Sequence, residues 1–167
     1  MTVRLAGPPD DAALPRVDVD LLRTRARKAL AALGHGRSEL SLTLTDDRGI
    51  AELNEAWRGK RGPTDVLSFS LLEGDHAEHR GALLGDVVIG VAEAARQARA
   101  AHRGLDREVA ELAIHGILHL LGHDHEEEAE ARVMRAEERR LRRALGLGRG
   151  GPASRPPRPR GRRGPRR

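Results

Sequence analysis

The chain of 167 residues contains no cysteine and no tyrosine, and its only large aromatic residues are Trp57 and Phe69. The absence of cysteine excludes disulfides, metal sites built on thiolates and cysteine nucleophiles. Because aromatic residues are so scarce, the hydrophobic core must be built from Leu, Val, Ile and Ala.

The sequence also lacks the features of membrane and exported proteins. No apolar run approaches the roughly 18 residues that a membrane-spanning helix needs. No N-terminal stretch pairs a basic region with the apolar run of a secretion signal. We therefore expect a soluble, cytoplasmic protein that does not enter a membrane.

Lysine is scarce as well, since Lys28 and Lys60 are the only lysines among 30 basic residues. So uniform a bias toward arginine is weak evidence for nucleic-acid binding. The net charge of +5 is concentrated in residues 148–167, which carry eight arginines and no acidic residue; removing them leaves −3 for residues 1–147. Length and composition predict one domain over residues 1–147 and a disordered tail, rich in Arg, Pro and Gly, over residues 148–167.

The spacing of apolar residues predicts an α+β domain. Leu40, Leu42 and Leu44 alternate with polar residues, which is typical of a half-buried strand, whereas residues 19–33 have apolar residues at helical spacing. The expected strands cover residues 2–5, 40–45, 65–71 and 82–89, and the expected helices cover residues 19–33, 47–57, 93–102, 107–121 and 127–145. We expect a small mixed sheet of about four strands packed by about five helices.

The most informative stretch is HGILHLLGHDH at residues 115–125. His115 and His119 are four residues apart, so a central helix would place both on one face. Gly122 can end that helix with a positive φ, which would turn His125 back toward the same point. Three imidazoles with one open position are the ligand set of a catalytic zinc site. In so apolar a helix, unpartnered histidines would be costly.

Two features of this stretch keep alternatives open. His123 is a rival for the third ligand position. The spacing HxxxHxxGxxH is also that of metzincin peptidases, but Gly116 stands where those enzymes carry their general base, a glutamate. Peptide hydrolysis by the usual route is therefore disfavoured. A glycine within a helix costs about 1 kcal/mol relative to alanine, so Gly116 indicates that substrate or another backbone approaches closely.

Three segments together resemble the YbeY family of zinc-binding endoribonucleases. HGILHLLGHDH is similar to the family signature HGxLHLxGYDH, residues 53–70 resemble its LNxxYRxKDxPTDVLSFP segment, and residues 83–89 resemble its LGDIVI strand. A weaker likeness covers Met134, Glu138 and Leu141. The departures are His123 for Tyr, Ser70 for Pro and Arg61 for an acidic residue.

The resemblance implies a single-strand-specific endoribonuclease that acts in rRNA maturation, at the 3′ end of 16S rRNA, and in ribosome quality control. It implies one zinc ion held by His115, His119 and His125, and it matches Arg58 to an active-site arginine. Ribosomal subunits or assembly proteins would be partners, and no nucleotide cofactor is expected. The alternatives are a metzincin-like metallopeptidase and a non-catalytic ribosome-assembly factor with a structural metal.

The general base stays open at this stage. Glu111 lies one turn before His115, and Asp124 and Asp86 are the other candidates. Each is expected more often to orient a histidine than to take a proton. Asp124 could alternatively cap the last helix.

Overall fold

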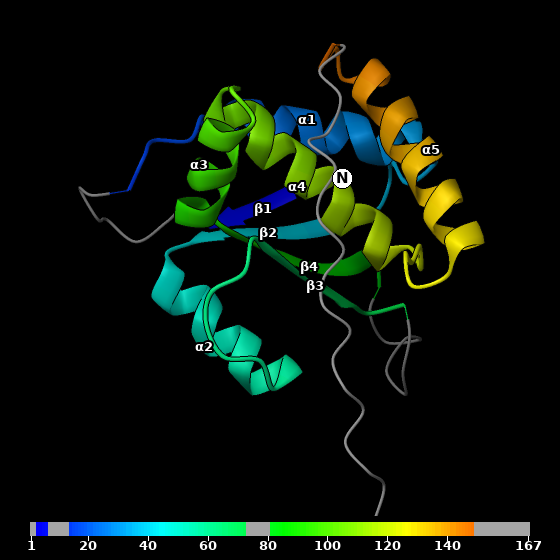
Figure 1. The fold of residues 1–167 in the computed structure, drawn as a ribbon. Helices are drawn as coiled ribbons and strands as arrows, with labels where there is room; N and C mark the ends of the chain where they lie inside the picture. Colours follow the sequence, from blue (N-terminus) through cyan, green and yellow to red (C-terminus); the bar gives the residue numbers. More distant parts are fainter. Residues whose placement is uncertain (1–2, 7–13, 73–80, 149–167) are drawn as a thin grey trace, which may run out of the picture.

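The computed structural model describes residues 3–6, 14–72 and 81–148, so the predicted tail beyond Gly148 lies outside the described residues (Figure 1). The sheet has the order β1-β2-β4-β3. Its strands are β1 (Val3–Ala6), β2 (Glu39–Thr45), β3 (Val66–Ser70) and β4 (Leu83–Gly90). The first three in this order are parallel, and β3 pairs with β4 in the antiparallel sense as an edge strand.

Five helices accompany the four strands within the described residues. They are α1 (Val19–Ala32), α2 (Asp47–Arg58), α3 (Val91–Ala100), α4 (Leu105–Leu120) and α5 (Glu128–Ala144). The predicted α+β class and mixed four-stranded sheet are confirmed, and the element bounds differ from the expected ones by one or two residues. None of these helices is long and apolar enough to cross a membrane.

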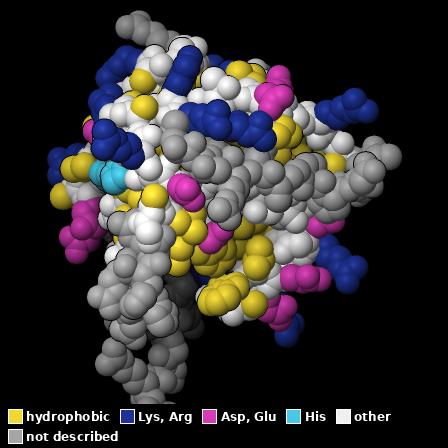
Figure 2. Space-filling model, turned by 180° about the vertical axis from the view of Figure 1, so that it is seen from behind, with side chains coloured by type: hydrophobic (Ala, Val, Ile, Leu, Met, Phe, Trp, Pro, Cys, Tyr) yellow, Lys and Arg dark blue, Asp and Glu magenta, His cyan; other side chains and the backbone are white. Residues whose placement is uncertain are grey.

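The helices form unequal layers on the two faces of the sheet. Figure 1 shows α1, α3, α4 and α5 on one side and α2 alone on the other. On the face turned away in Figure 1, Lys and Arg side chains gather mostly over the upper half, where the four-helix layer lies, and a hydrophobic patch is exposed below them (Figure 2). On this face, positive charge is therefore concentrated over the helical layer.

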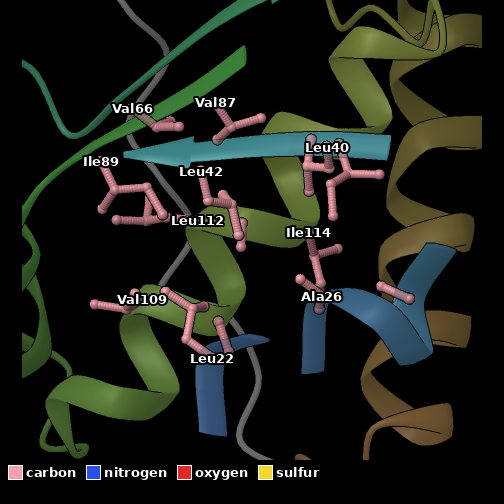
Figure 3. Close-up of a cluster of buried hydrophobic side chains, with 14 of the residues drawn as sticks. Leu22, Ala26, Leu40, Leu42, Val66, Val87, Ile89, Val109, Leu112 and Ile114 are labelled. Atoms are coloured by element: carbon pink, nitrogen blue, oxygen red, sulfur yellow. The ribbon is translucent and has the colours of Figure 1, made fainter. Parts of the chain in front are cut away.

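The larger core lies between the sheet and α4. Leu40 and Leu42 of β2 are fully buried there, as their alternation with polar residues predicts. Figure 3 shows them with Val87 of β4, close to Leu112 and Ile114 of α4. A smaller cluster of Ile50, Leu67 and Val88 lies beneath α2. Neither cluster contains an aromatic residue among its fully buried members, so the core is aliphatic as expected.

Helix α4 is the central helix of the fold because it is apolar almost all round. Eleven of its 16 residues are buried, whereas a surface helix buries only one stripe. His115 and His119 are among the few that stay partly accessible. The helix thus places two polar rings at the boundary of a dry core.

Gly116 allows α4 to approach the sheet. A Cβ atom at this position would lie 2.6 Å from Val87 Cγ1 and 3.2 Å from Ser68 Oγ. The Ser68 hydroxyl donates a hydrogen bond to the Gly116 carbonyl, with a separation of 3.2 Å. The close approach expected from this mid-helix glycine therefore comes from side chains of β3 and β4, and not from a substrate.

We predict that Gly116→Ala destabilises the protein by about 1–3 kcal/mol, because the new methyl group has no room beside Val87. Thermal unfolding would show a fall in Tm of roughly 2–4 °C for each kcal/mol. Gly36→Ala is the matched control, since a Cβ there makes only ordinary contacts, at 3.7 Å or more. Without the contact, helix propensity alone would make Gly116→Ala stabilising by about 1 kcal/mol; a raised Tm would contradict the close packing.

Candidate metal centre

The three predicted histidines converge through the turn that follows α4. His115 and His119 lie one helical turn apart near the C-terminal end of α4. Gly122 adopts a φ of 90°, and the backbone N–H of His123 donates to the Leu118 carbonyl at 3.0 Å. This closure of the helix end reverses the chain and returns His125 toward α4. The predicted role of Gly122 is confirmed.

The three imidazoles form a compact cluster. One ring nitrogen from each of His115, His119 and His125 lies within 4.8 Å of the other two. The Nε2 atoms of His115 and His119 are 3.0 Å apart. Around a tetrahedral zinc ion with Zn–N bonds of about 2.0–2.1 Å, neighbouring nitrogens lie about 3.4 Å apart. The cluster therefore fits one such ion after small side-chain shifts. His123 is not part of it, so the structure favours His125 as the third member.

The electrostatic environment suits metal binding. Burial, followed by the positive charges of His115 and His125, lowers the pKa of the His119 imidazole to about 4. His119 is therefore neutral near pH 7, which is the form that binds a metal. The His125 side chain is 53% exposed, whereas that of His115 is only 20% exposed. The cluster is thus closed toward the core and open toward solvent on the side of His125.

A carboxylate from α5 contacts the cluster from behind. Glu138 Oε1 lies 2.9 Å from His115 Nδ1. Burial by itself raises the pKa of the Glu138 carboxyl, but the hydrogen bond from His115 and the positive charges of His115 and Arg142 outweigh it and hold that pKa below its usual value. An ionised carboxylate only accepts hydrogen bonds. His115 therefore donates from Nδ1 to Glu138 and turns its Nε2 atom toward His119.

Sequence reasoning did not find this contact, although the sequence carried a signal for it. Met134 and Leu141 of α5 are buried, and Glu138 lies on the same helix face between them. An acidic residue in line with buried apolar positions faces the protein interior, and it needs a partner there.

The three candidate bases lie in different surroundings. Glu111 pairs with Arg142, Oε2 to Nε at 2.5 Å, rather than with a histidine. Asp86 alternates with Val87, which faces α4, so it points to the opposite side of the sheet. Asp124 lies near the cluster: its Oδ1 is 3.8 Å from His125 Nδ1 and accepts the His125 backbone N–H at 2.6 Å.

Asp124 therefore fixes the backbone of the turn that carries His125. The alternative that it caps the last helix is wrong, because Glu127 is the N-cap residue of α5. Asp124 Oδ1 instead accepts the backbone N–H of Glu126, which lies before the helix begins.

Arg58 is not part of the histidine cluster. It is the last residue of α2, where its side chain is exposed and Gly59 ends the helix with a φ of 62°. Helix α2 lies across the sheet from α4 (Figure 1). The predicted role of Arg58 stays a prediction.

Comparison with known proteins identifies the family. The family model for endoribonuclease YbeY matches residues 15–146. The chain belongs to this family. The resemblance seen in the three sequence segments is therefore confirmed, and the match covers all five helices.

Individual relatives give the extent of the similarity. The chain is 52% identical over 126 residues to endoribonuclease YbeY of Anaeromyxobacter sp. strain Fw109-5, a match that covers 75% of this chain but only 64% of that protein. It is 50% identical over 148 residues to endoribonuclease YbeY of Anaeromyxobacter dehalogenans strain 2CP-C, which covers 88% and 73% of the two chains. A solution structure of a Thermotoga maritima protein matches with a TM-score of 0.60 and 27% identity, over 87% of this chain and 91% of that one.

We predict that His115→Ala, His119→Ala and His125→Ala each abolish stoichiometric binding of zinc, because each removes one of three nitrogens that converge. The metal content of purified protein, loaded with zinc and then dialysed, measures this by elemental analysis. His123→Ala is the matched control and should keep one ion per chain. Loss of zinc in His123→Ala together with retention in His125→Ala would contradict the geometry of the turn.

Proposed function

We propose that the chain is a zinc-dependent endoribonuclease that cleaves single-stranded RNA in rRNA maturation, at the 3′ end of 16S rRNA, and in ribosome quality control. The observation that carries the proposal is a cluster of three histidines, open to solvent on one side, in a member of the YbeY family. It would act in the cytoplasm on ribosomal subunits or with assembly proteins, without a nucleotide cofactor. Residues 1–147 form the catalytic domain, and the arginine-rich tail (residues 148–167) raises the encounter rate with RNA.

The proposed cleavage assigns a separate role to each of several residues. When bound, zinc supplies Lewis acidity for the attack of water on the phosphodiester. His119 is held neutral by burial, and Glu138 orients the His115 ring so that its Nε2 faces the same point. The exposed side of His125 leaves access for RNA. Arg58 keeps its charge at every physiological pH and can bind two phosphate oxygens at once, which stabilises the additional charge of the transition state.

Edge strand β3 lies between the helix that carries Arg58 and the helix that carries His115 and His119. On one face, β3 contacts α4 through hydrogen bonds from Ser68 and Ser70 to the carbonyls of Gly116 and Leu120. On the other face it contacts α2. An RNA strand that contacts both Arg58 and the histidines would therefore cross the edge of the sheet at β3.

A metallopeptidase of the metzincin type fits this structure poorly. The position that would carry the base glutamate is Gly116, which is buried against Val87 and Ser68. A glutamate there would point into the sheet instead of toward the histidines. A structural metal in a non-catalytic assembly factor fits less well too, because structural zinc sites are closed by a fourth protein ligand. In the part of the chain that the structure describes, three residues form the cluster.

The test of the proposal is cleavage of a single-stranded oligoribonucleotide by the purified protein. We expect cleavage to stop with a chelator and to return when zinc is added back. A duplex of the same sequence and the corresponding single-stranded DNA should be spared. If metal-loaded protein left the single-stranded RNA intact, the proposed activity would be refuted.

In the same assay, Arg58→Ala should lower the cleavage rate at least ~100-fold, the scale of losing one donor to a developing oxyanion. Its zinc content and Tm should match the wild type, because the side chain is exposed. Arg48→Ala is the control: Arg48 lies on the same helix, and its exposed ion pair with Glu52 adds little to stability. Near-normal cleavage by Arg58→Ala would refute a catalytic role for Arg58, which would then be only a solvent-exposed residue at the end of α2.

A further inference from the structure

A row of charged side chains connects the histidine cluster to α5 and back to α4. Glu138 accepts from His115 through Oε1, and its Oε2 lies 3.6 Å from Arg142 Nη2. Arg142 also binds Glu111, one turn before His115 on α4. The side chains of Glu138, Arg142 and Glu111 are only 15%, 12% and 8% exposed. The row is therefore largely shielded from water.

Such an arrangement is a poor source of stability. Removing charges from water costs several kcal/mol for each ion, and pairing recovers this cost only with good geometry. The geometry does, however, orient one ring. Glu138 Oε1 lies 2.9 Å from His115 Nδ1, so the ring turns its other nitrogen, Nε2, toward His119.

We propose that Glu138 is a positioning residue for metal binding: it sets the tautomer and ring orientation of His115 and thereby raises the metal affinity of the three-histidine cluster. This inference rests on the proposed metal site. When a carboxylate accepts a hydrogen bond from the nitrogen of a histidine that does not face the metal, the other nitrogen becomes a stronger metal ligand. Loss of such a carboxylate weakens metal affinity about 10- to 100-fold.

Zinc affinity, measured by competition with a chromophoric chelator, tests this proposal without any RNA. Glu138→Ala should weaken zinc binding about 10- to 100-fold. Glu138→Gln keeps an acceptor oxygen of the same shape but loses the charge, so it should fall between Glu138→Ala and the wild type. Glu137→Gln is the matched control, because Glu137 is the neighbouring residue and pairs with Arg140 on the surface.

The tautomer of His115 gives a second measurement, which a merely structural role would not change. In nitrogen-detected NMR spectra of the metal-free protein, His115 should carry its proton on Nδ1 in the wild type and in Glu137→Gln, and lose this preference in Glu138→Ala. Unchanged zinc affinity and an unchanged tautomer in folded Glu138→Gln and Glu138→Ala would overturn the proposal. If the wild type bound zinc but cut no RNA, the proposed function would fail and this inference would stand.

A separate observation concerns Trp57, the only tryptophan of the chain. It is 71% exposed, and among the described residues Val133 is the other large hydrophobic side chain that is exposed. The Trp57 ring system packs against Phe69 of β3 in an edge-to-face arrangement, with ring centroids 5.8 Å apart at 64°. Phe69 in turn packs on the small cluster beneath α2. The indole is therefore supported from the protein side while most of its surface faces water.

Three basic residues follow Trp57 closely in the chain. Arg58, Lys60 and Arg61 follow it within four residues, all of them exposed, and residues 56–63 contain no acidic residue. The loop that carries Lys60 and Arg61 is held by Asn54, whose amide donates to the Gly62 carbonyl at 3.0 Å. An exposed aromatic ring with cationic residues close by in the chain is a combination that can bind a base and its neighbouring phosphates in single-stranded nucleic acids.

We infer that Trp57 is a stacking platform for a base of the single-stranded RNA substrate, with Arg58, Lys60 and Arg61 at the adjoining phosphates. The inference rests on the proposed function for the identity of the ligand. The platform is attached to β3 through Phe69, and β3 contacts the histidine helix through Ser70. A base on Trp57 and a phosphate at the histidines would thus lie on two sides of the same edge strand.

The fluorescence of the single tryptophan tests this directly. Metal-free protein, which should not cleave, is titrated with a short single-stranded oligoribonucleotide, and stacking should quench the emission. Trp57→Ala should weaken binding of the labelled oligonucleotide about 5- to 150-fold, Trp57→Phe should retain part of the affinity, and Val133→Ala should bind like the wild type.

Binding without quenching, together with wild-type affinity in Trp57→Ala, would overturn the platform and leave the proposed cleavage untouched. Emission that responds to ribosomal proteins but not to free RNA would also overturn it, because the exposed indole would then be a protein contact. If RNA quenched the emission but the metal-loaded protein cleaved no RNA, the stacking site at Trp57 would be supported and the proposed function refuted.

Discussion

The close contact between α4 and the sheet is the constraint on which the rest of the structure depends. Gly116 lets the helix approach until Val87 and Ser68 touch its backbone, and the apolar residues on both sides of the contact then exclude water. His115 and His119 are carried on that immobilised helix at the edge of the aliphatic core. A histidine pair on a rigid, buried helix keeps its geometry without help from an ion, so the fold prepares the site before any metal arrives.

Much of this arrangement could be predicted because it is local. The alternation of Leu40, Leu42 and Leu44 has the period of a strand, and the spacing of His115 and His119 has the period of a helix, so both follow from backbone geometry. The turn at Gly122 is equally local, since a positive φ after an apolar helix is a property of one residue. These features gave the mixed sheet, the central helix and the three converging histidines.

The features that escaped prediction depend on segments far apart in the chain. Glu138 meets His115 across 23 positions, and this contact follows from how α5 packs on α4, although Glu138 already belongs to the weak family likeness in the last helix. Gly116 showed that something approached, but its partners lie on β3 and β4, which sequence spacing does not reveal. Asp124 had two local alternatives with similar sequence signals, and its hydrogen bonds to the next two backbone N–H groups decide between them.

The division between local ligands and a distant carboxylate has a thermodynamic consequence. If the cluster binds zinc as proposed, the segment with His115, His119 and His125 stays contiguous in an unfolded chain and would retain some affinity for the ion. The contact with Glu138 exists only when α5 is docked. With zinc as the bound ion, the carboxylate would widen the difference in zinc affinity between folded and unfolded chains, and by linkage that difference would be the stabilisation that zinc adds. The buried charges of Glu138 and Arg142, which contribute little stability alone, would thus set the coupling between metal binding and the docking of α5 on α4.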